Sequence, residues 1–140
     1  MKILLAVDGS AYTKRMLACL AAHEEWLGNR HAYTVIFAVP AVPPSAAAVL
    51  EKSVLKGHYD EEADKVLNPI RKFFDQQGTV ATFVAQVGPA AEHICSLAEE
   101  GDFDLLVMGS HGRGTLLNLV MGSVATQVLA GCKTPLLLVR

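Results

Sequence analysis

Apolar residues along this chain gather in five short runs, separated by longer segments in which they recur every three or four residues. The runs predict strands over Lys2 to Val7, Tyr33 to Val39, Thr79 to Val87, Phe103 to Met108 and Thr134 to Val139. The first run is apolar after its opening residue, as expected of a parallel strand covered on both faces. The spacing between the runs is that of helices buried along one side.

The helical spacing indicates where four helices begin and end. They are expected from Ser10 to about Trp26, from about Ala46 to Gln77, from Pro89 to Gly101, and over Val124 to Ala130 with Ser123 as the cap. Gly57 and Pro69 fall inside the second helix, where such residues bend or divide a helix. The proline-rich stretch Pro40 to Ser45 predicts a loop rather than a helix.

Strand and helix alternate throughout, which predicts an α/β fold: a three-layer, doubly wound, five-stranded parallel sheet. Two strand orders fit, 3-2-1-4-5 and 2-1-3-4-5. Ligands of such sheets bind beyond the carboxyl ends of the strands, where the winding reverses. The first order brings Asp8 beside Gly109, whereas the second leaves the later glycine loop away from the crevice. Alternating polar residues in the third run, such as Thr82 and Gln86, indicate an edge strand and favour 3-2-1-4-5.

The stretch from Gly109 to Thr126 carries glycines spaced Gly109-x2-Gly112-x9-Gly122, followed by Ser123. Glycines let a backbone approach a ligand closely, and the free N–H groups of a helix start attract anions. This arrangement predicts a phosphate cradle, against the alternative of a glycine-rich surface loop without a ligand. It is neither a P-loop, because no Gly-Lys-Ser/Thr ending occurs here, nor a G-x-G-x-x-G dinucleotide loop.

The same spacing resembles the nucleotide-binding signature G-x2-G-x9-G-[S/T] of the universal stress protein family, in its ATP-binding subclass. The opening ILLAVDGS resembles the first strand and turn of that family, and the region from Gly88 to Arg140 resembles its second half. The middle, Pro40 to Asn68, matches only loosely, and Gly88-Pro89 departs from the more usual Gly-x-Pro. The resemblance implies the order 3-2-1-4-5, an adenine nucleotide (ATP, or AMP or ADP) with Mg²⁺ accompanying it, and a dimer.

The candidate binding residues come from both lines of reasoning. By chemistry, Asp8 accepts hydrogen bonds from a ribose or an adenine amine, or else forms an Asx turn. By resemblance, the Val39 backbone pairs with the adenine edge and Met108 lies against the base, although it also serves as core filler. The resemblance also assigns backbone contacts with phosphate to Gly109, Gly112, Gly122, Ser123 and Val124. His111 and Arg113 supply positive charge, unless Arg113 is simply solvated.

No catalytic or metal-binding group stands out in the sequence. Ser110 and His111 are adjacent, and sequence neighbours rarely form a nucleophile–base pair. The remaining histidines are scattered, without the spacing of metal ligands. Three interpretations therefore stay open: a module that senses or sequesters ATP, a slow ATPase or phosphotransferase that uses a divalent cation, and an interaction module that binds no nucleotide. The glycine spacing disfavours the last, and the missing base and lysine disfavour efficient hydrolysis.

Composition narrows the class of protein. The chain has 140 residues, 51% hydrophobic and 19% charged, with a formal net charge of −2, which indicates one folded domain over residues 1–140. It predicts no nucleic-acid surface and no membrane span, since no run approaches the roughly 20 apolar residues that a span requires. Three cysteines without a Cys-x-x-Cys pattern indicate reduced thiols in a cytoplasmic protein. A regulatory protein partner is an open expectation.

The last apolar run predicts a homodimer. In the order 3-2-1-4-5, Thr134 to Val139 lies at the sheet edge, yet only Pro135 near its start and its flanking charges protect it. Pairing with a second copy across a two-fold axis would satisfy its backbone groups. The family resemblance implies the same dimer through the last strand. The alternative is that a helix or the Pro40 to Ser45 loop covers this edge within one chain.

Overall fold

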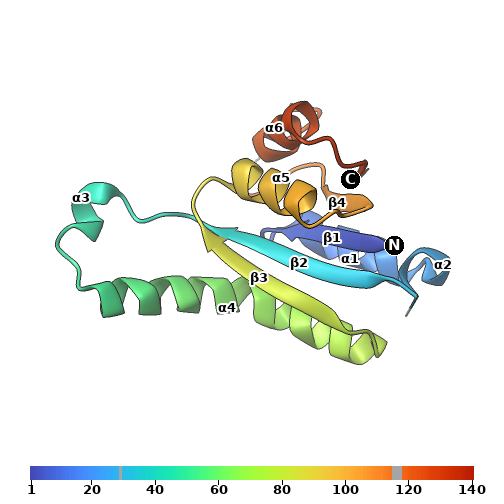
Figure 1. Cartoon of the computed structure of the whole chain (residues 1–140), viewed down its shortest axis with the longest axis horizontal. Coiled ribbons are helices and arrows are strands. Elements are labelled where there is room, and N and C mark those ends of the chain that lie inside the picture. Colours follow the sequence, from blue (N-terminus) through green and yellow to red (C-terminus); the bar gives the residue numbers. More distant parts are fainter. Residues whose placement is uncertain (29, 115–117) are drawn as a thin grey trace.

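The computed structural model describes residues 1–28, 30–114 and 118–140, and it forms a parallel sheet between two layers of helices (Figure 1). The elements are β1 (Lys2–Val7), α1 (Ala11–Ala21), α2 (Glu24–Leu27), β2 (Ala32–Val39), α3 (Pro44–Ala47), α4 (Lys52–Gln77), β3 (Ala81–Val87), α5 (Ala90–Glu100), β4 (Leu105–Gly109), α6 (Ser123–Gly131) and β5 (Leu136–Val139). The five strands lie in the order β3-β2-β1-β4-β5, which confirms the predicted α/β fold and its strand order.

The strand β1 is central and pairs in parallel with both neighbours. Its register sets Leu4 opposite Thr34 of β2 and opposite Leu106 of β4. Leu4 and Leu106 are fully buried, as expected of strands covered on both faces. The strand β3 is an edge strand, and several of its side chains are exposed, as its polar alternation predicts.

Two apolar clusters hold the helices to the sheet. The helices α1 and α4 pack on one face, through residues such as Met16 and Leu67, against Leu5 and Val35. The helices α5 and α6 cover the other face together, and their contacts include Ile94 and Val128 (Figure 1). Full burial of such side chains stabilises the fold by about 1.5–3 kcal/mol each relative to exposure.

The helix boundaries differ from the sequence-based prediction in three places. The first predicted helix ends at Ala21, and a separate short helix, α2, follows it. The expected proline loop contains the short helix α3, because a proline at the first helical position has a suitable φ and alanines favour helix. The helix α4 begins later than expected, at Lys52, and runs without division through Gly57 and Pro69. Its end at Gly78 is explained by that residue's left-handed conformation, φ 65°.

Candidate functional site

A cavity of about 460 Å³ lies beyond the carboxyl ends of β1 and β4. This is the point where the winding of the sheet reverses, and its volume is typical of a small-molecule site. The structure brings nine of the ten predicted site residues to its walls: Asp8, Met108, Gly109, His111, Gly112, Arg113, Gly122, Ser123 and Val124. Apolar residues from both layers of helices, such as Val66 and Ile94, complete the lining.

Val39 is the predicted site residue that does not line the cavity. Its side chain is buried in the core, and its carbonyl oxygen accepts a hydrogen bond of 2.9 Å from the Gly88 N–H. Its neighbours Ala38 and Pro40 do line the cavity. The backbone at the end of β2 therefore reaches the cavity through the residues on either side of Val39.

The two carboxylate oxygens of Asp8 have different surroundings. Its Oδ1 accepts hydrogen bonds from the Ser10 N–H (2.9 Å) and from the Thr13 hydroxyl (3.0 Å). The Asp8 N–H in turn donates to Thr13 Oγ1 at 3.1 Å. The sequence offered an Asx turn and a ligand contact as alternatives for Asp8. The Asx turn is present on Oδ1, while Oδ2 lies beside Gly112, 2.6 Å from the position that a Cβ there would occupy.

The glycine loop packs tightly against itself where it enters α6. Gly122 donates its N–H to the Ser110 carbonyl at 2.8 Å, and a Cβ on Gly122 would lie 3.1 Å from His111 Cα. Gly122 is also the N-cap of α6, so the prediction that Ser123 caps this helix is wrong: Ser123 is the first helical residue. The Gly122 backbone is extended (φ −72°, ψ 166°), and no side chain of the described residues bonds to this helix start.

This helix start is suited to bind an anion. The first N–H groups of a helix have no intrahelical acceptor, and the helix dipole places partial positive charge there. Ser123 and Val124, the first two residues of α6, both line the cavity. The backbone of α6 therefore presents donors to the cavity without a capping side chain in front of them.

Ser110 and His111, adjacent in sequence, are joined by a hydrogen bond. Ser110 Oγ lies 2.8 Å from His111 Nδ1, and His111 Nε2 lies 2.7 Å from the Leu119 carbonyl. A carbonyl can only accept, so Nε2 carries a proton and a neutral ring accepts the Ser110 hydroxyl proton at Nδ1. Ser110 is buried and does not line the cavity. The pair therefore holds the loop in place instead of presenting a nucleophile.

Charged side chains from α4 also reach the cavity, and the sequence analysis missed them. Glu62 and Lys65 both line it and form an ion pair, with Lys65 Nζ 2.8 Å from Glu62 Oε1. That hydrogen bond and the Lys65 charge lower the pKa of Glu62, and Arg113 adds a smaller contribution in the same direction. The same hydrogen bond raises the pKa of Lys65. Their i, i+3 spacing predicts the pair, but nothing in the sequence predicts its place beside the glycine loop.

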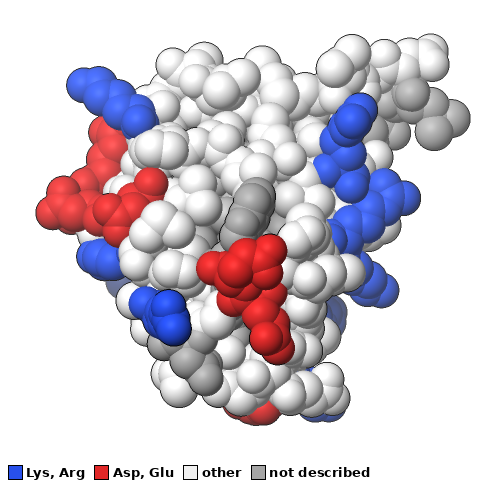
Figure 2. All heavy atoms as spheres, turned by 90° about the vertical axis from the view of Figure 1, so that its right-hand side faces the viewer, with Lys and Arg blue, Asp and Glu red and all other residues white. Residues whose placement is uncertain are grey.

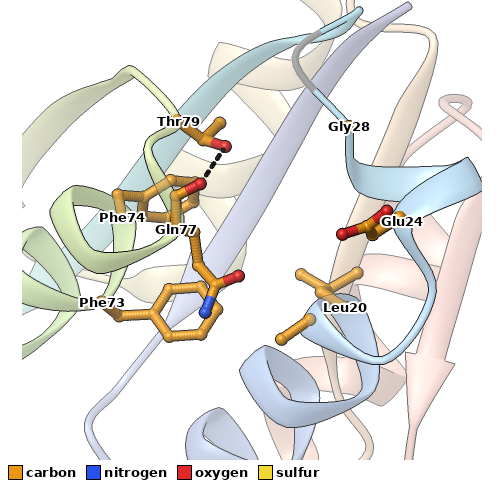
Figure 3. A pocket seen from close by; sticks show the side chains of 8 residues that line it. Leu20, Glu24, Gly28, Phe73, Phe74, Gln77 and Thr79 are labelled. Carbon is orange, nitrogen blue, oxygen red and sulfur yellow. Dashed lines mark hydrogen bonds between the residues drawn. The ribbon is translucent and has the colours of Figure 1, made fainter.

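A second, smaller cavity of about 250 Å³ lies at the opposite end of the sheet. Phe73 and Phe74 of α4 form one side, and Leu20 and Glu24 face them across the opening (Figure 3). The strands begin at this end, and the molecular face there carries both acidic and basic side chains (Figure 2). None of the predicted site residues lines this cavity, so the larger one is the candidate site.

The comparison with known families decides the identity of the chain. The model of the universal stress protein family matches residues 1–140. The chain belongs to the universal stress protein family. A universal stress protein of Thermus aquaticus is 33% identical over 138 residues, which is 99% of this chain and 97% of that protein.

Two other relatives match over less of their own length. Universal stress protein MJ0577 of Methanocaldococcus jannaschii is 33% identical over 99 residues, covering 66% of this chain and 61% of that protein. Universal stress protein Slr1230 of Synechocystis is 30% identical over 99% of this chain, but the match spans only 42% of its length. These two sequence matches therefore span about two fifths to three fifths of the relatives' own length.

Solved structures of the family share this fold. The structure of MJ0577 superposes with a TM-score of 0.81, at 26% identity, over 99% of this chain and 94% of that one. A universal stress protein of Archaeoglobus fulgidus in complex with dAMP has a TM-score of 0.69 at 20% identity, covering 100% and 98% of the two chains. One from Arabidopsis thaliana with AMP bound has a TM-score of 0.71 at 13% identity, covering 99% and 90%.

The described residues, 1–28, 30–114 and 118–140, show neither a membrane-spanning helix nor a cluster of metal ligands. None of their helices is long and apolar enough to cross a membrane. Nor do they contain a group of three or more histidine, cysteine, aspartate or glutamate side chains placed to hold a metal ion.

Proposed function

We propose that this universal stress protein binds ATP in the larger cavity and acts as a cytoplasmic regulatory protein. The observation that carries the proposal is the fit of the glycine loop: side chains at Gly112 and Gly122 would collide with Asp8 and with the loop backbone. Glycines allow a phosphate group to come close to the backbone, and the uncapped helix start beside them offers N–H donors to it. Family members of the same fold hold AMP, dAMP and, in another structure, cAMP, which supports an adenine nucleotide.

The lining residues divide into a phosphate end and a base end. At the phosphate end, the N–H groups of Ser123 and Val124 donate to the phosphates. Gly112 and Gly122 let the loop backbone come close to the phosphates, and Gly109, His111 and Arg113 lie nearby. Arg113 Nη2 lies 2.7 Å from the Cβ position of Gly9, so its guanidinium lies beside the turn that follows β1. At the base end, Met108 lies against the adenine and the backbone around Val39 reads its edge. Asp8 Oδ2 accepts from the ribose or the amine.

A Mg²⁺ ion fits this site only as part of the nucleotide complex. Two carboxylates, Asp8 and Glu62, line the cavity, and Mg²⁺ binds proteins through one or two carboxylates together with substrate phosphates and water. Asp8 Oδ2 would hold the ion in place of its contact with the ribose or the amine, because Oδ1 already accepts from Ser10 and Thr13. When bound, the ion neutralises part of the phosphate charge. The chain's own residues then hold the nucleotide in place.

Binding without rapid turnover is the proposed activity, and the nucleotide content of the purified protein tests it. We expect denaturation of freshly purified protein to release ATP in an amount approaching one per chain, identified by chromatography. Phosphate release measured over hours then separates storage of ATP from slow hydrolysis. Protein that carries no nucleotide and takes up none at millimolar ATP would refute the proposal. It would then favour the interaction module that binds no nucleotide.

Base recognition gives a prediction of its own. An acceptor at Asp8 and backbone groups around Val39 suit the adenine edge, whereas guanine reverses the donor and acceptor at the corresponding positions. ATP at 100 times its dissociation constant should stabilise the fold by about 2.7 kcal/mol. We expect GTP at the same concentration to raise the melting temperature by clearly less. Thermal denaturation with each nucleotide measures this, with cytidine triphosphate as a control for the phosphates alone. An equal or larger shift with GTP contradicts the assignment of the base end.

We further propose that two chains pair through β5, within Thr134 to Val139, to form a homodimer. The strand is at the sheet edge and its side chains are half-buried. The Pro135 and Val139 carbonyls accept hydrogen bonds from Leu106 and Ser110 on the β4 side. Because backbone groups alternate along a strand, those of Leu136 and Leu138 point to the open edge. A second copy of β5 across a two-fold axis supplies their partners.

Location and partner follow from the same proposal. The three cysteines are free thiols, and reduced cysteines are typical of the cytoplasm. A regulatory role requires that another macromolecule distinguish the nucleotide-bound from the nucleotide-free state. We therefore propose a protein partner that contacts the rim of the cavity, where the exposed Leu119 and Val120 lie.

A further inference from the structure

Two cysteines meet on the face of the sheet that α5 and α6 cover, away from the walls of the nucleotide cavity. Cys95 lies in the middle of α5, and Cys132 is the C-cap of α6. Both are half-buried free thiols packed against one apolar cluster, whose members include Ile94 and Val128. Neither the fold nor the proposed nucleotide site requires a cysteine at either position.

Backbone contacts hold the end of α6 against α5 at this point. The Lys133 N–H donates to Glu99 Oε1 at 3.0 Å, and the Cys132 N–H donates to the Val128 carbonyl at 2.9 Å. Glu99 lies one helical turn after Cys95, on the same side of α5. Because Cys132 immediately precedes Lys133, it is the neighbour of Cys95 at this contact. Burial, and secondarily this neighbour, raises the pKa of Cys95 to about 11.

We propose that Cys95 and Cys132 form a redox modification site, which closes to an intramolecular disulfide when the protein meets a peroxide. A disulfide needs two side chains at close range, and the contact between Lys133 and Glu99 brings the positions of Cys132 and Cys95 together, against one apolar cluster. Both are half-buried rather than sealed, so a small oxidant reaches them. Disulfides in reducing compartments are mostly transient and redox-sensing, which fits a reversible bond here.

The reaction is balanced with one peroxide molecule. Burial keeps Cys95 protonated, so Cys132 reacts first: its thiolate sulfur attacks the O–O bond and becomes a sulfenic acid, and the other peroxide oxygen leaves as water after taking up a proton. The sulfur of the second cysteine then attacks the sulfenic sulfur, the S–S bond forms, and the hydroxyl leaves as water with the second thiol's proton. Two thiols are oxidised, and one peroxide is reduced to two waters. A dithiol reductant reverses the bond by exchange.

The bond ties the end of α6 to α5, whereas the start of α6 belongs to the proposed phosphate cradle. No lining residue of the cavity changes, so we expect the oxidised protein still to bind nucleotide. The two proposals therefore fail separately. A disulfide can form in a protein that binds no nucleotide, and nucleotide binding does not depend on the thiols.

The test treats the purified reduced protein with a small excess of hydrogen peroxide. We expect its intact mass to fall by about 2 Da, because two hydrogens leave, and two of its three thiols to become unreactive toward alkylation. The melting temperature should rise by roughly 5 °C, because the crosslink restricts the unfolded chain. Reduction with dithiothreitol should restore the original mass and melting temperature.

Single substitutions locate the bond. Cys95→Ser and Cys132→Ser should each lose the mass change and the melting shift. Cys19→Ser is the matched control and should keep both, because Cys19 lies in α1, which packs on the opposite face of the sheet. Peptide mapping of the oxidised unmodified protein should give a linked pair of peptides containing residues 95 and 132, and this measurement needs no variant to fold. Crosslinks between chains, a bond to Cys19, or oxidation without any crosslink would overturn the proposal.

Discussion

Gly122→Val should weaken ATP binding by roughly 5- to 150-fold, which corresponds to the 1–3 kcal/mol that overpacking of a tight site costs. The extra carbons enter at the narrowest part of the loop, where a Cβ would lie 3.1 Å from His111 Cα, 3.4 Å from the Ser110 carbonyl oxygen and 3.5 Å from the Gly112 nitrogen. Backbone atoms cannot rotate away as a side chain end can. The loop must therefore move, and the N–H groups aimed at the phosphates move with it.

Titration calorimetry of ATP into the variant measures the loss, and a second glycine of the same helix provides the control. Gly131 closes α6, and a Cβ there meets nothing within 4 Å, so Gly131→Ala should bind ATP like the unmodified protein. Gly112→Val should resemble Gly122→Val, because its Cβ would lie 2.6 Å from Asp8 Oδ2. Unchanged affinity in both cavity variants, with the native fold retained by circular dichroism, would refute the phosphate cradle.

Leu138→Pro should convert the proposed dimer into a folded monomer. Proline removes the N–H of a residue whose backbone groups point to the open edge of β5, so pairing with β4 survives while pairing with a second chain does not. Leu137→Lys is a harsher alternative, because Leu137 packs against the core beneath α1 and its replacement also destabilises the single chain. Sedimentation at micromolar concentration should give twice the 15.0 kDa chain mass for the unmodified protein and the chain mass for Leu138→Pro.

Leu138→Ala separates the role of the backbone from that of the side chain. It removes the same apolar contact with the cluster beneath α5 and α6, but it keeps the N–H. We expect this variant to remain a dimer, with lower stability. If the unmodified protein sediments only as a single chain, the β5 dimer does not exist. If Leu138→Pro remains a dimer, a different surface holds the chains together.

The sheet was predictable from sequence because its strands are short apolar runs, in which few polar residues can be accommodated. Leu4 and Leu106 must be apolar on whichever face they lie, since both faces are covered. The edge position of β3 was predictable for the opposite reason, its alternation with polar residues such as Thr82. Boundaries of the helices were less predictable, because proline at the start of a short helix such as α3 is locally indistinguishable from proline in a loop.

The part of the candidate site formed by the glycine loop was predictable from sequence. The part formed by side chains from distant helices was less predictable. The glycine spacing located the loop, but the serine after Gly122 suggested the wrong cap residue, because the extended backbone of Gly122 already fills that role. Lys65 comes from a helix distant in sequence, and only the packing of α4 on the sheet brings it to the cavity. Ser110 and His111 bond although they are adjacent, because the loop folds back toward Leu119.

The central position of β1 has a consequence for the order in which the chain can fold during synthesis. One side of β1 pairs with residues about thirty positions later, such as Leu4 with Thr34, whereas the other side pairs Leu4 with Leu106. At roughly 5–20 residues per second, a ribosome needs on the order of ten seconds to reach that second partner. During that interval one edge of the central strand lacks its native neighbour, and a chaperone that covers exposed strand edges would act there first.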